Sequence, residues 1–237
     1  MLVALGTLAT QQSKPTESLW NDITWFLNYA ASHPDAIFFS ASNMILHIFS
    51  DGSYLSKSKS RSRVGGIFYL SSKLPQHNQA PYCNHSLNAP FHVVANILKM
   101  ITISVMENEV AATFYNTKEA LPFRLTLAEM GHPQPLTTME VDNETAIGFL
   151  KSTMKQKRSE AIDMRFYWVR DRVNKNQFMI YWRPGANNVG DYVSKHHSPA
   201  HHQTMGPNVF VNLVCQNPYT YTENCLQRLS LCLLQGV

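Results

Sequence analysis

Two apolar runs joined by a short polar connection constrain the fold of this chain most. Residues 44–49 and 64–70 are rich in β-branched and aromatic residues and are bounded by Gly and Ser, so both predict strands. The stretch between them, "SDGSYLSKSKSRSR", is short and polar, and we therefore expect an antiparallel pair. Asp51 follows the first apolar run after a single serine, which places it at the end of the first predicted strand.

The patterns that follow predict further strands and helices in an order that favours a mixed sheet. The expected elements are a helix at 15–33, a strand in 91–103, a helix from about 105 to 121 that Pro122 disturbs, a strand at 136–141, a helix that opens at Asp142 or Asn143, a helix at 160–173, a strand at 178–182 and a short helix at 187–196. Three strands followed by αβααβα elements, with a crossover helix, are typical of the α/β class.

Length and composition indicate an ordinary globular protein with appendages. The chain has 237 residues, of which 44% are apolar and 15% charged. We expect an N-terminal helical segment at 1–43, an α/β domain at 44–203 and a C-terminal tail at 204–237, to which the sequence assigns no element. No uncharged apolar run approaches the roughly 18 to 20 residues of a membrane span, so we expect no membrane partner.

Cysteine usage bears on the compartment. The four cysteines lie far apart and form no CxxC pair, so they predict neither a disulfide framework nor a cysteine zinc site. The first residues, "MLVALGTLATQQ", lack the positive charges that open a secretory signal. A reducing, intracellular location is therefore expected, and the sequence leaves the choice between cytoplasm and nucleus open.

Four acidic residues fall at predicted strand ends or on predicted helices, namely Asp51, Glu109, Asp142 and Asp191. If the strands that carry Asp51 and Asp142 are parallel neighbours, about 4.8 Å apart, both carboxylates project beyond the same sheet edge. Mg²⁺ prefers oxygen ligands and is commonly held by one or two carboxylates, so it suits such a sparse cluster. Each acid alone also has a structural explanation, as a turn residue, a helix cap or a solvated charge. Their combination carries the hypothesis of a metal site.

Four stretches resemble the blocks of the ribonuclease H domain in copia-type (LTR) retrotransposon Pol polyproteins, and they occur in the same order. These stretches are "FSDGSY", "SVMENEVAA", "MEVDNETAIGFL" and "GDYVSKHH". Upstream, "KPTESLWNDITWFLNYAASHPDAI" is similar to the connection that follows the reverse-transcriptase polymerase in such polyproteins. The resemblance covers about residues 12–205. It implies a ribonuclease H-like fold, with a mixed five-stranded sheet and flanking helices, and a chain that is a fragment or remnant of a larger Pol protein.

The resemblance also implies an activity and a set of site residues. Asp51, Glu109, Asp142 and Asp191 would hold two Mg²⁺ ions, for which Mn²⁺ is expected to substitute, and the reaction would be endonucleolytic hydrolysis of the RNA strand of an RNA–DNA hybrid. A reverse-transcriptase polymerase domain is a second implied partner. Glu107 is the rival to Glu109, since residues two apart on a helix point to different faces. The family pattern, in which the second acid of an E-x-E pair precedes small apolar residues, favours Glu109.

Two other functions remain open at this point. The chain could be a catalytically decayed or co-opted copy that only binds nucleic acid, because Gly190 stands where the family suggests alanine and no histidine lies shortly before Asp191. It could also be a DNA transposase or resolvase, which shares strand-end acids, although the copia-like order of blocks argues against it.

Basic residues form two clusters that predict contacts with nucleic-acid phosphates. Lys57, Lys59, Arg61 and Arg63 alternate with serines in the first cluster, and Lys151, Lys155, Lys157 and Arg158 make up the second. Such contacts hold the backbone without reading sequence. The alternative, a solvated loop, stays open for both clusters. Asn143, beside a predicted ligand, is a candidate for contact with a ribose 2′-hydroxyl.

Aromatic and histidine clusters have simpler interpretations. Three consecutive aromatics at 166–168 cannot face one way on a helix, and Phe166 fits the apolar stripe, so we expect core packing. In "HHSPAHH", His197 and His201 have zinc-ligand spacing, but no paired cysteines accompany them. An exposed loop is the alternative for this segment.

Overall fold

The chain forms one mixed sheet with helices on both of its faces. The computed structural model describes residues 2–32, 39, 41–57, 60–73, 85–86, 88–151, 164–185 and 188–210. The elements are α1 Leu2–Ala9, α2 Glu17–Ser32, β1 Ile45–Lys57, β2 Arg61–Lys73, β3 His85–Ser86, β4 Pro90–Ile97, α3 Val105–Glu129, β5 Thr137–Val141, α4 Glu144–Leu150, α5 Met164–Asn174, β6 Phe178–Trp182, α6 Asp191–Ser194 and α7 Pro199–Phe210.

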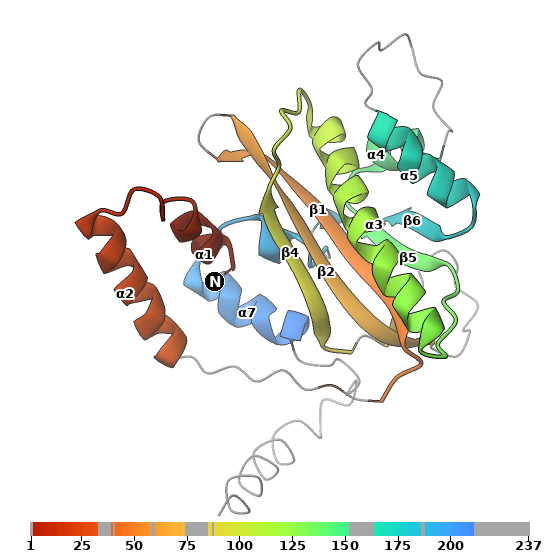
Figure 1. Ribbon diagram of the computed structural model, residues 1–237, viewed down its shortest axis with the longest axis horizontal. Coiled ribbons are helices and arrows are strands. Elements are labelled where there is room, and N and C mark those ends of the chain that lie inside the picture. The colour runs from red at the N-terminus through yellow and green to blue at the C-terminus, as the bar shows by residue number, and fades with distance from the viewer. Residues whose placement is uncertain are drawn as a thin grey trace, which may run out of the picture.

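The sheet has the order β3-β2-β1-β5-β6, and β4 also pairs with β2 (Figure 1). β1 pairs with β2 antiparallel and with β5 parallel, and β5 pairs with β6 parallel. β3 contributes only two residues, so five strands make up the body of the sheet. The mixed five-stranded sheet with flanking helices that the sequence predicted is therefore confirmed.

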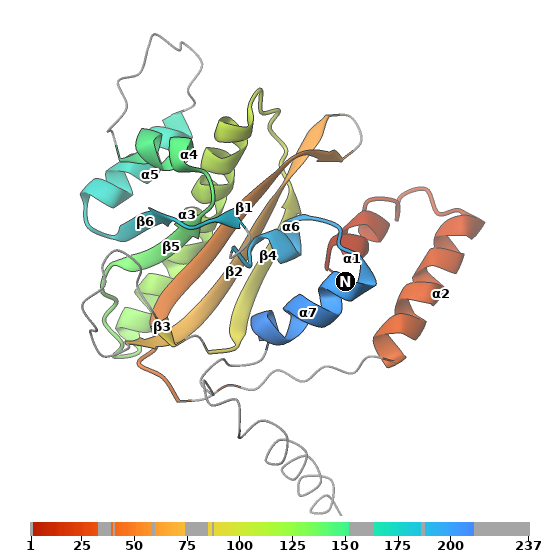
Figure 2. The ribbon, with the colours of Figure 1, turned by 180° about the vertical axis from the view of Figure 1, so that it is seen from behind.

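Helices cover the two faces of the sheet unequally. α3, α4 and α5 lie on one face, and the short α6 and α7 lie on the other (Figures 1 and 2). Neighbouring residues of β1 serve the two faces in turn, as a pleated strand requires: Ile48 belongs to the larger core under α3, whereas Phe49 belongs to a smaller core with Val193 and Val209. Asp51, the acid of β1, is thus held between two packed layers.

The strands of the first hairpin are longer than the sequence predicted. β1 continues to Lys57, and the register still joins Asp51 with Gly65 and Ser53 with Arg63. Asp51 therefore lies inside β1 and not at its end. The antiparallel pairing itself is confirmed.

α3 also runs further than predicted, because Pro122 does not end it. The helix continues for seven residues beyond this proline, to Glu129. Proline removes one backbone donor and leaves the carbonyl of residue 118 without its helical partner. Lys118 and Pro122 are both exposed, so water can solvate that carbonyl. The interruption is tolerated because it faces solvent.

Some of the other predicted elements are confirmed, and one helix was not predicted. β6 lies where it was predicted, and α4 opens after its N-cap Asn143. Phe166 is buried in the larger core, as predicted, and Trp168 packs edge-on against Phe114. α7 was not predicted, and the domain boundary expected at residue 203 falls inside it.

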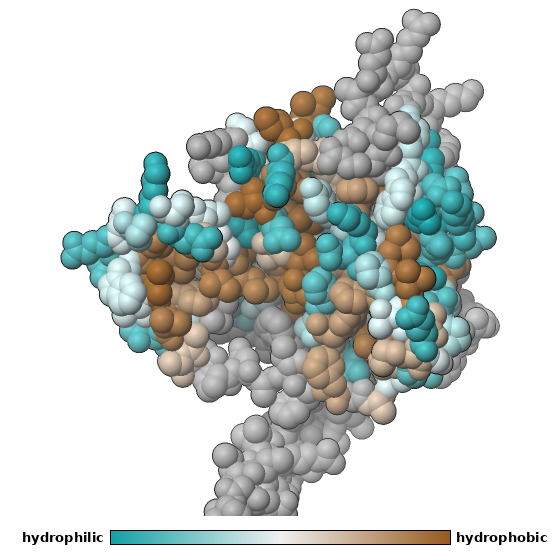
Figure 3. Space-filling model, in the orientation of Figure 1, coloured by the Kyte–Doolittle hydropathy of each residue, from teal (hydrophilic) through white to brown (hydrophobic). Residues whose placement is uncertain are grey.

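The position of α2 and the exposed apolar side chains are the last features of the fold. α2 stands to the side of the sheet, and of its residues only Leu19 is buried (Figure 2). Apolar and polar patches alternate over the surface (Figure 3), and exposed apolar side chains include Ile101 and Ile103 in the connection between β4 and α3. Each helix in the described part of the chain is either too short or too polar to cross a membrane.

Candidate metal centre

Asp51 and Asp142 are brought together by parallel pairing of β1 with β5. The register joins Phe49 to Glu140, so Asp51 and Asp142 stand two residues further along their neighbouring strands. Asp51 is 1% exposed, and Asp142 directly follows β5. The condition that the sequence left open, that these strands are parallel neighbours, is met.

Asp191 reaches the same place from the opposite layer. It is the first residue of α6, and the preceding turn is fixed to β1 because Asn188 Nδ2 donates to Ser50 O at 3.0 Å. The Asn188 side-chain oxygen in turn accepts from Gly190 N at 3.0 Å. One carboxylate oxygen from each of Asp51, Asp142 and Asp191 lies within 4.8 Å of the others. We call these three residues the aspartate cluster.

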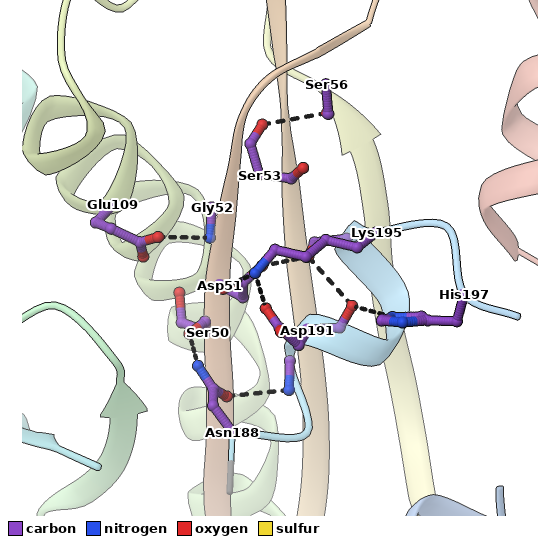
Figure 4. A network of polar contacts seen from close by, with 12 residues as sticks. Ser50, Asp51, Gly52, Ser53, Ser56, Glu109, Asn188, Asp191, Lys195 and His197 are labelled. Atoms are coloured by element: carbon purple, nitrogen blue, oxygen red, sulfur yellow. Dashed lines mark hydrogen bonds and ion pairs between the residues drawn. The ribbon is translucent and has the colours of Figure 1, made fainter. Parts of the chain in front are cut away.

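Glu109 borders the aspartate cluster from α3. The backbone N–H of Gly52 donates to Glu109 Oε1 at 3.2 Å, while Glu109 Oε2 and Asp51 Oδ1 are buried and accept no hydrogen bond in the described structure (Figure 4). Glu107 points elsewhere, since its Oε2 accepts from Ile103 N at 2.7 Å at the start of the helix. Of the two rival glutamates, Glu109 is the one that lies next to Asp51.

Burial and the charges of neighbouring carboxylates raise the pKa values of Asp51, Glu109 and Asp142. Burial, and then the charge of Asp191, raise the pKa of Asp51 to about 7. The pKa of Glu109 lies well above its ordinary value because of burial and the charges of Asp51 and Asp142. Burial also raises the pKa of Asp142. Without a cation, the cluster therefore disfavours full ionisation.

We expect the metal-free protein to become less stable as the pH rises from about 4 to 7. Asp51 titrates near 3.8 in an unfolded chain and near 7 in the folded one, so the folded state holds an extra proton in this window. The contribution of Asp51 to the free energy of unfolding then falls as pH rises and is lost above pH 7.

Urea unfolding in EDTA at a series of pH values measures this slope. Asp51→Asn should reduce this slope, whereas Asp22→Asn, at an exposed position of α2, should leave it unchanged. An equal slope in wild type and Asp51→Asn would contradict the prediction.

The ligands present suit a hard divalent cation. They are carboxylates only, and two of their oxygens are buried without a hydrogen-bond donor. Mg²⁺ and Mn²⁺ prefer such oxygen ligands. The residues around the aspartate cluster therefore fit the metal that the sequence predicted.

The predicted phosphate contacts are distributed unevenly. Arg61 is exposed at the start of β2, and Lys57 ends β1. Asn143 caps α4, with its Oδ1 accepting from Ala146 N at 3.0 Å. Lys151 is exposed just after α4. Lys59, Lys155, Lys157 and Arg158 lie outside the described residues.

Arg63 does not lie on the surface, where the alternating pattern had placed it. Its side chain is 0% exposed, and Nη1 donates to Ala95 O at 3.0 Å. α1 packs over it, since a Cβ added to Gly6 would lie 3.3 Å from Arg63 Nη1. Because β2 begins at Arg61, Arg63 belongs to the sheet and not to a loop. In this structure it is covered and is not available to a phosphate.

Sequence reasoning missed two residues at the centre. Ser194 Oγ donates to Asp51 Oδ2, and Lys195 Nζ is paired with Asp191 Oδ1. The available signal was spacing: Lys195 follows Asp191 by four positions, which is the separation of neighbours on one helix face.

The histidines after α6 form a stack and not a metal site. The rings of His197 and His201 stack with centroids 4.1 Å apart, and His197 Nε2 lies 2.9 Å from Asp191 O. In the part of the chain that the structure describes, the aspartate cluster is the one group of three potential ligands close enough to share an ion.

Gly65 allows α6 to approach the sheet. A Cβ at this position would lie 2.8 Å from both Gly190 O and Ser194 Cβ. We expect Gly65→Ala to cost about 1–3 kcal/mol of stability, because the added methyl group pushes α6 away from the sheet. The displaced helix moves Asp191 away from Asp51, so Mn²⁺ binding should weaken as well.

Gly66→Ala is the matched comparison for this prediction. Its Cβ would meet Asn116 on the opposite face of the sheet, so stability should fall without displacement of α6. Chemical denaturation and calorimetric Mn²⁺ titration of both variants test this. Equal Mn²⁺ affinity in the two variants would argue against the spacer role of Gly65.

The sequence of this chain is similar to part of a retrotransposon Pol polyprotein. No family model matches the chain. A retrovirus-related Pol polyprotein from transposon TNT 1-94 of Nicotiana tabacum is 22% identical over 193 residues, which are 81% of this chain and 13% of that protein. The chain thus spans about an eighth of the relative's length. The predicted resemblance to retrotransposon Pol polyproteins is confirmed.

Solved structures similar to the chain include ribonucleases H. The N-terminal RNase H domain of Rv2228c from Mycobacterium tuberculosis is 14% identical, with a TM-score of 0.43 over 68% of this chain and 98% of that one. LC11-RNase H1, isolated from compost, is 12% identical, with a TM-score of 0.44 over 63% and 92%. Both likenesses concern the fold alone.

Proposed function

We propose that this chain hydrolyses the RNA strand of an RNA–DNA hybrid with divalent cations held by Asp51, Glu109, Asp142 and Asp191. One observation carries the proposal: three aspartates from β1, the end of β5 and α6 converge within 4.8 Å, beside a buried glutamate from α3. The similarity to a retrotransposon Pol polyprotein supports this substrate class.

The cations supply the reactivity in this proposal. When bound, two Mg²⁺ or Mn²⁺ ions polarise the scissile phosphate, lower the pKa of an attacking water and stabilise the leaving oxygen. The carboxylates act as ligands and not as proton carriers. Their part is to stay fixed, and the backbone N–H of Gly52 and the hydroxyl of Ser194 hold Glu109 and Asp51 in place.

The chain's own basic residues would hold the hybrid. Arg61 stands exposed at the tip of the β1–β2 hairpin, the strand pair that carries Asp51. We assign it to phosphate contacts together with Lys57, Lys59 and the cluster that begins at Lys151. Asn143 is assigned to the ribose through its side-chain N–H, because its oxygen is engaged in capping α4. Such contacts predict binding that weakens with salt.

We further propose that the chain works as part of a Pol protein, next to a reverse-transcriptase polymerase domain. The relative that it resembles is a polyprotein of which the chain covers 13%. In this proposal residues 1–43, which include α1 and α2, are the link to the polymerase. The nuclease domain begins at residue 44, and the tail follows α7.

The experiment is cleavage of an end-labelled RNA–DNA hybrid by the purified chain in Mg²⁺ or Mn²⁺. We expect cuts in the RNA strand only, and none in EDTA or in duplex DNA of the same sequence. A chain that is folded by circular dichroism but leaves the hybrid intact would refute the proposal. Cleavage of duplex DNA would favour a transposase or resolvase.

One observation favours a second function, that of a nucleic-acid-binding module without catalysis. Lys195 already neutralises part of the aspartate cluster, as a decayed metal site would allow. This alternative predicts salt-sensitive binding of the hybrid by wild type and Asp142→Asn alike, with no cleavage by either.

A further inference from the structure

Lys195 places an ammonium group among the carboxylates of the aspartate cluster. Its Nζ is ion-paired with Asp191 Oδ1 and lies 3.8 Å from Asp51 Oδ1 (Figure 4). The two acids come from different layers, since Asp51 belongs to β1 and Asp191 to α6. One side chain of this chain thus bridges the two elements that the metal is proposed to bridge.

The cluster needs a positive charge when no metal is bound. Three carboxylates lie within 4.8 Å of one another, and the buried Glu109 lies next to them. Like charges at this separation repel each other, and the repulsion is strongest at Asp51, which is buried. In the described part of the chain, both ion pairs made by Asp51 and Asp191 are made with Lys195.

The same side chain is able to leave. It is 40% exposed and follows the end of α6, while Asp51 is almost fully buried. A lysine ammonium is a point charge on a flexible four-carbon stem, so rotation about that stem carries it into solvent without moving the backbone.

We infer that Lys195 is an internal counter-ion that occupies the aspartate cluster in the metal-free protein and is displaced when a divalent cation binds. The inference rests on the proposed function in one respect, since it takes the cluster to be a metal site. It has two consequences. Lys195 stabilises the metal-free fold, and it competes with Mg²⁺ or Mn²⁺, so that it raises the metal concentration at which the site fills.

The test is a calorimetric Mn²⁺ titration of the full chain with Lys195→Met, which keeps an unbranched side chain one atom shorter than lysine and removes its charge. We expect Lys195→Met to bind Mn²⁺ roughly tenfold or more tightly than wild type, because no ammonium has to be displaced. In EDTA at neutral pH the same variant should unfold at a lower urea concentration than wild type.

Lys175→Met is the matched control. Lys175 pairs with Asp171 at 2.8 Å, with the same four-residue spacing as Asp191 and Lys195, but at the end of α5 and 56% exposed. Neither its Mn²⁺ affinity nor its stability in EDTA should change. If Lys195→Met does not fold, Lys195→Arg tests the inference instead. Arginine keeps the positive charge and pairs with carboxylates through a planar guanidinium group. Lys195→Arg should therefore bind Mn²⁺ no more tightly than wild type.

The outcomes separate this inference from the proposed function. Equal Mn²⁺ affinity in wild type and Lys195→Met overturns the inference, as does tighter binding by Lys195→Arg, even if the wild type cleaves hybrids. Tighter binding by Lys195→Met, with no hybrid cleavage by any form, keeps the inference and refutes the nuclease. If both hold, the Mn²⁺ concentration for half-maximal cleavage should fall in Lys195→Met.

Discussion

Asp142→Asn and Asp51→Asn are each expected to lower hybrid cleavage by roughly 10²- to 10³-fold or more, while the chain stays folded. A catalytic metal contributes several kcal/mol to the transition state, and each 1.36 kcal/mol corresponds to a factor of ten in rate. Asparagine keeps the shape of the side chain but loses the charge that holds the cation. Because both residues belong to the same cluster, the double variant should be little worse than either single one.

Single-turnover cleavage in Mg²⁺, with binding of the hybrid measured in parallel, checks this expectation. Glu144→Gln is the matched control, since Glu144 is an exposed acid two positions beyond Asp142. It should cleave like wild type. Full activity in Asp142→Asn would remove this residue from the site, and equal loss in Glu144→Gln would point to a general effect of charge.

Glu140→Ala is expected to lower the free energy of unfolding by about 3–5 kcal/mol, the typical cost of removing one partner of a buried ion pair. Glu140 lies in β5 and is 1% exposed. Tyr181 OH donates to its Oε1 at 2.5 Å, and Arg183 Nε forms an ion pair with Oε2 at 2.7 Å. His47 Nε2 lies 3.2 Å from Oε1. The alanine variant leaves all three groups without this partner.

Urea denaturation in EDTA measures the effect of this substitution. Glu140→Gln, which keeps an oxygen for Tyr181, should lose less stability than Glu140→Ala. Glu129→Ala, at an exposed position of α3, should stay within about 0.5 kcal/mol of wild type. A Glu140→Ala variant as stable as Glu129→Ala would show that this polar network does not stabilise the fold.

The sequence predicted features that depend on local pattern and missed those that depend on packing between distant segments. Alternation and apolar runs were enough for β6 and for the antiparallel pairing of β1 with β2. The continuation of α3 through Pro122 required knowledge of which side faces water. The burial of Arg63 was equally hidden, because it depends on α1, a helix some 60 residues earlier in the chain.

The candidate site shows the same division. Asp51 and Asp142 were predicted from strand ends, but the place of Asp191 depends on how closely α6 approaches Gly65. The spacing of Lys195 from Asp191 could have been noticed, but its approach to Asp51 was hidden for the same reason, because it depends on the docking of α6. Which of Glu107 and Glu109 faces β1 likewise became clear only from the structure, through the contact with Gly52.

The docking of α6 on β2 also has a consequence for the order in which the protein is made. A ribosome releases Asp51, Glu109 and Asp142 well before Asp191 and Lys195, and α6 then packs onto a strand made about 125 residues earlier. Until that late, long-range contact forms, Asp51 and Asp142 lie in the nascent sheet without the third aspartate, Asp191, and without the ammonium group of Lys195. The aspartate cluster is therefore complete only at the end of folding, and a chain interrupted before α6 would lack Asp191.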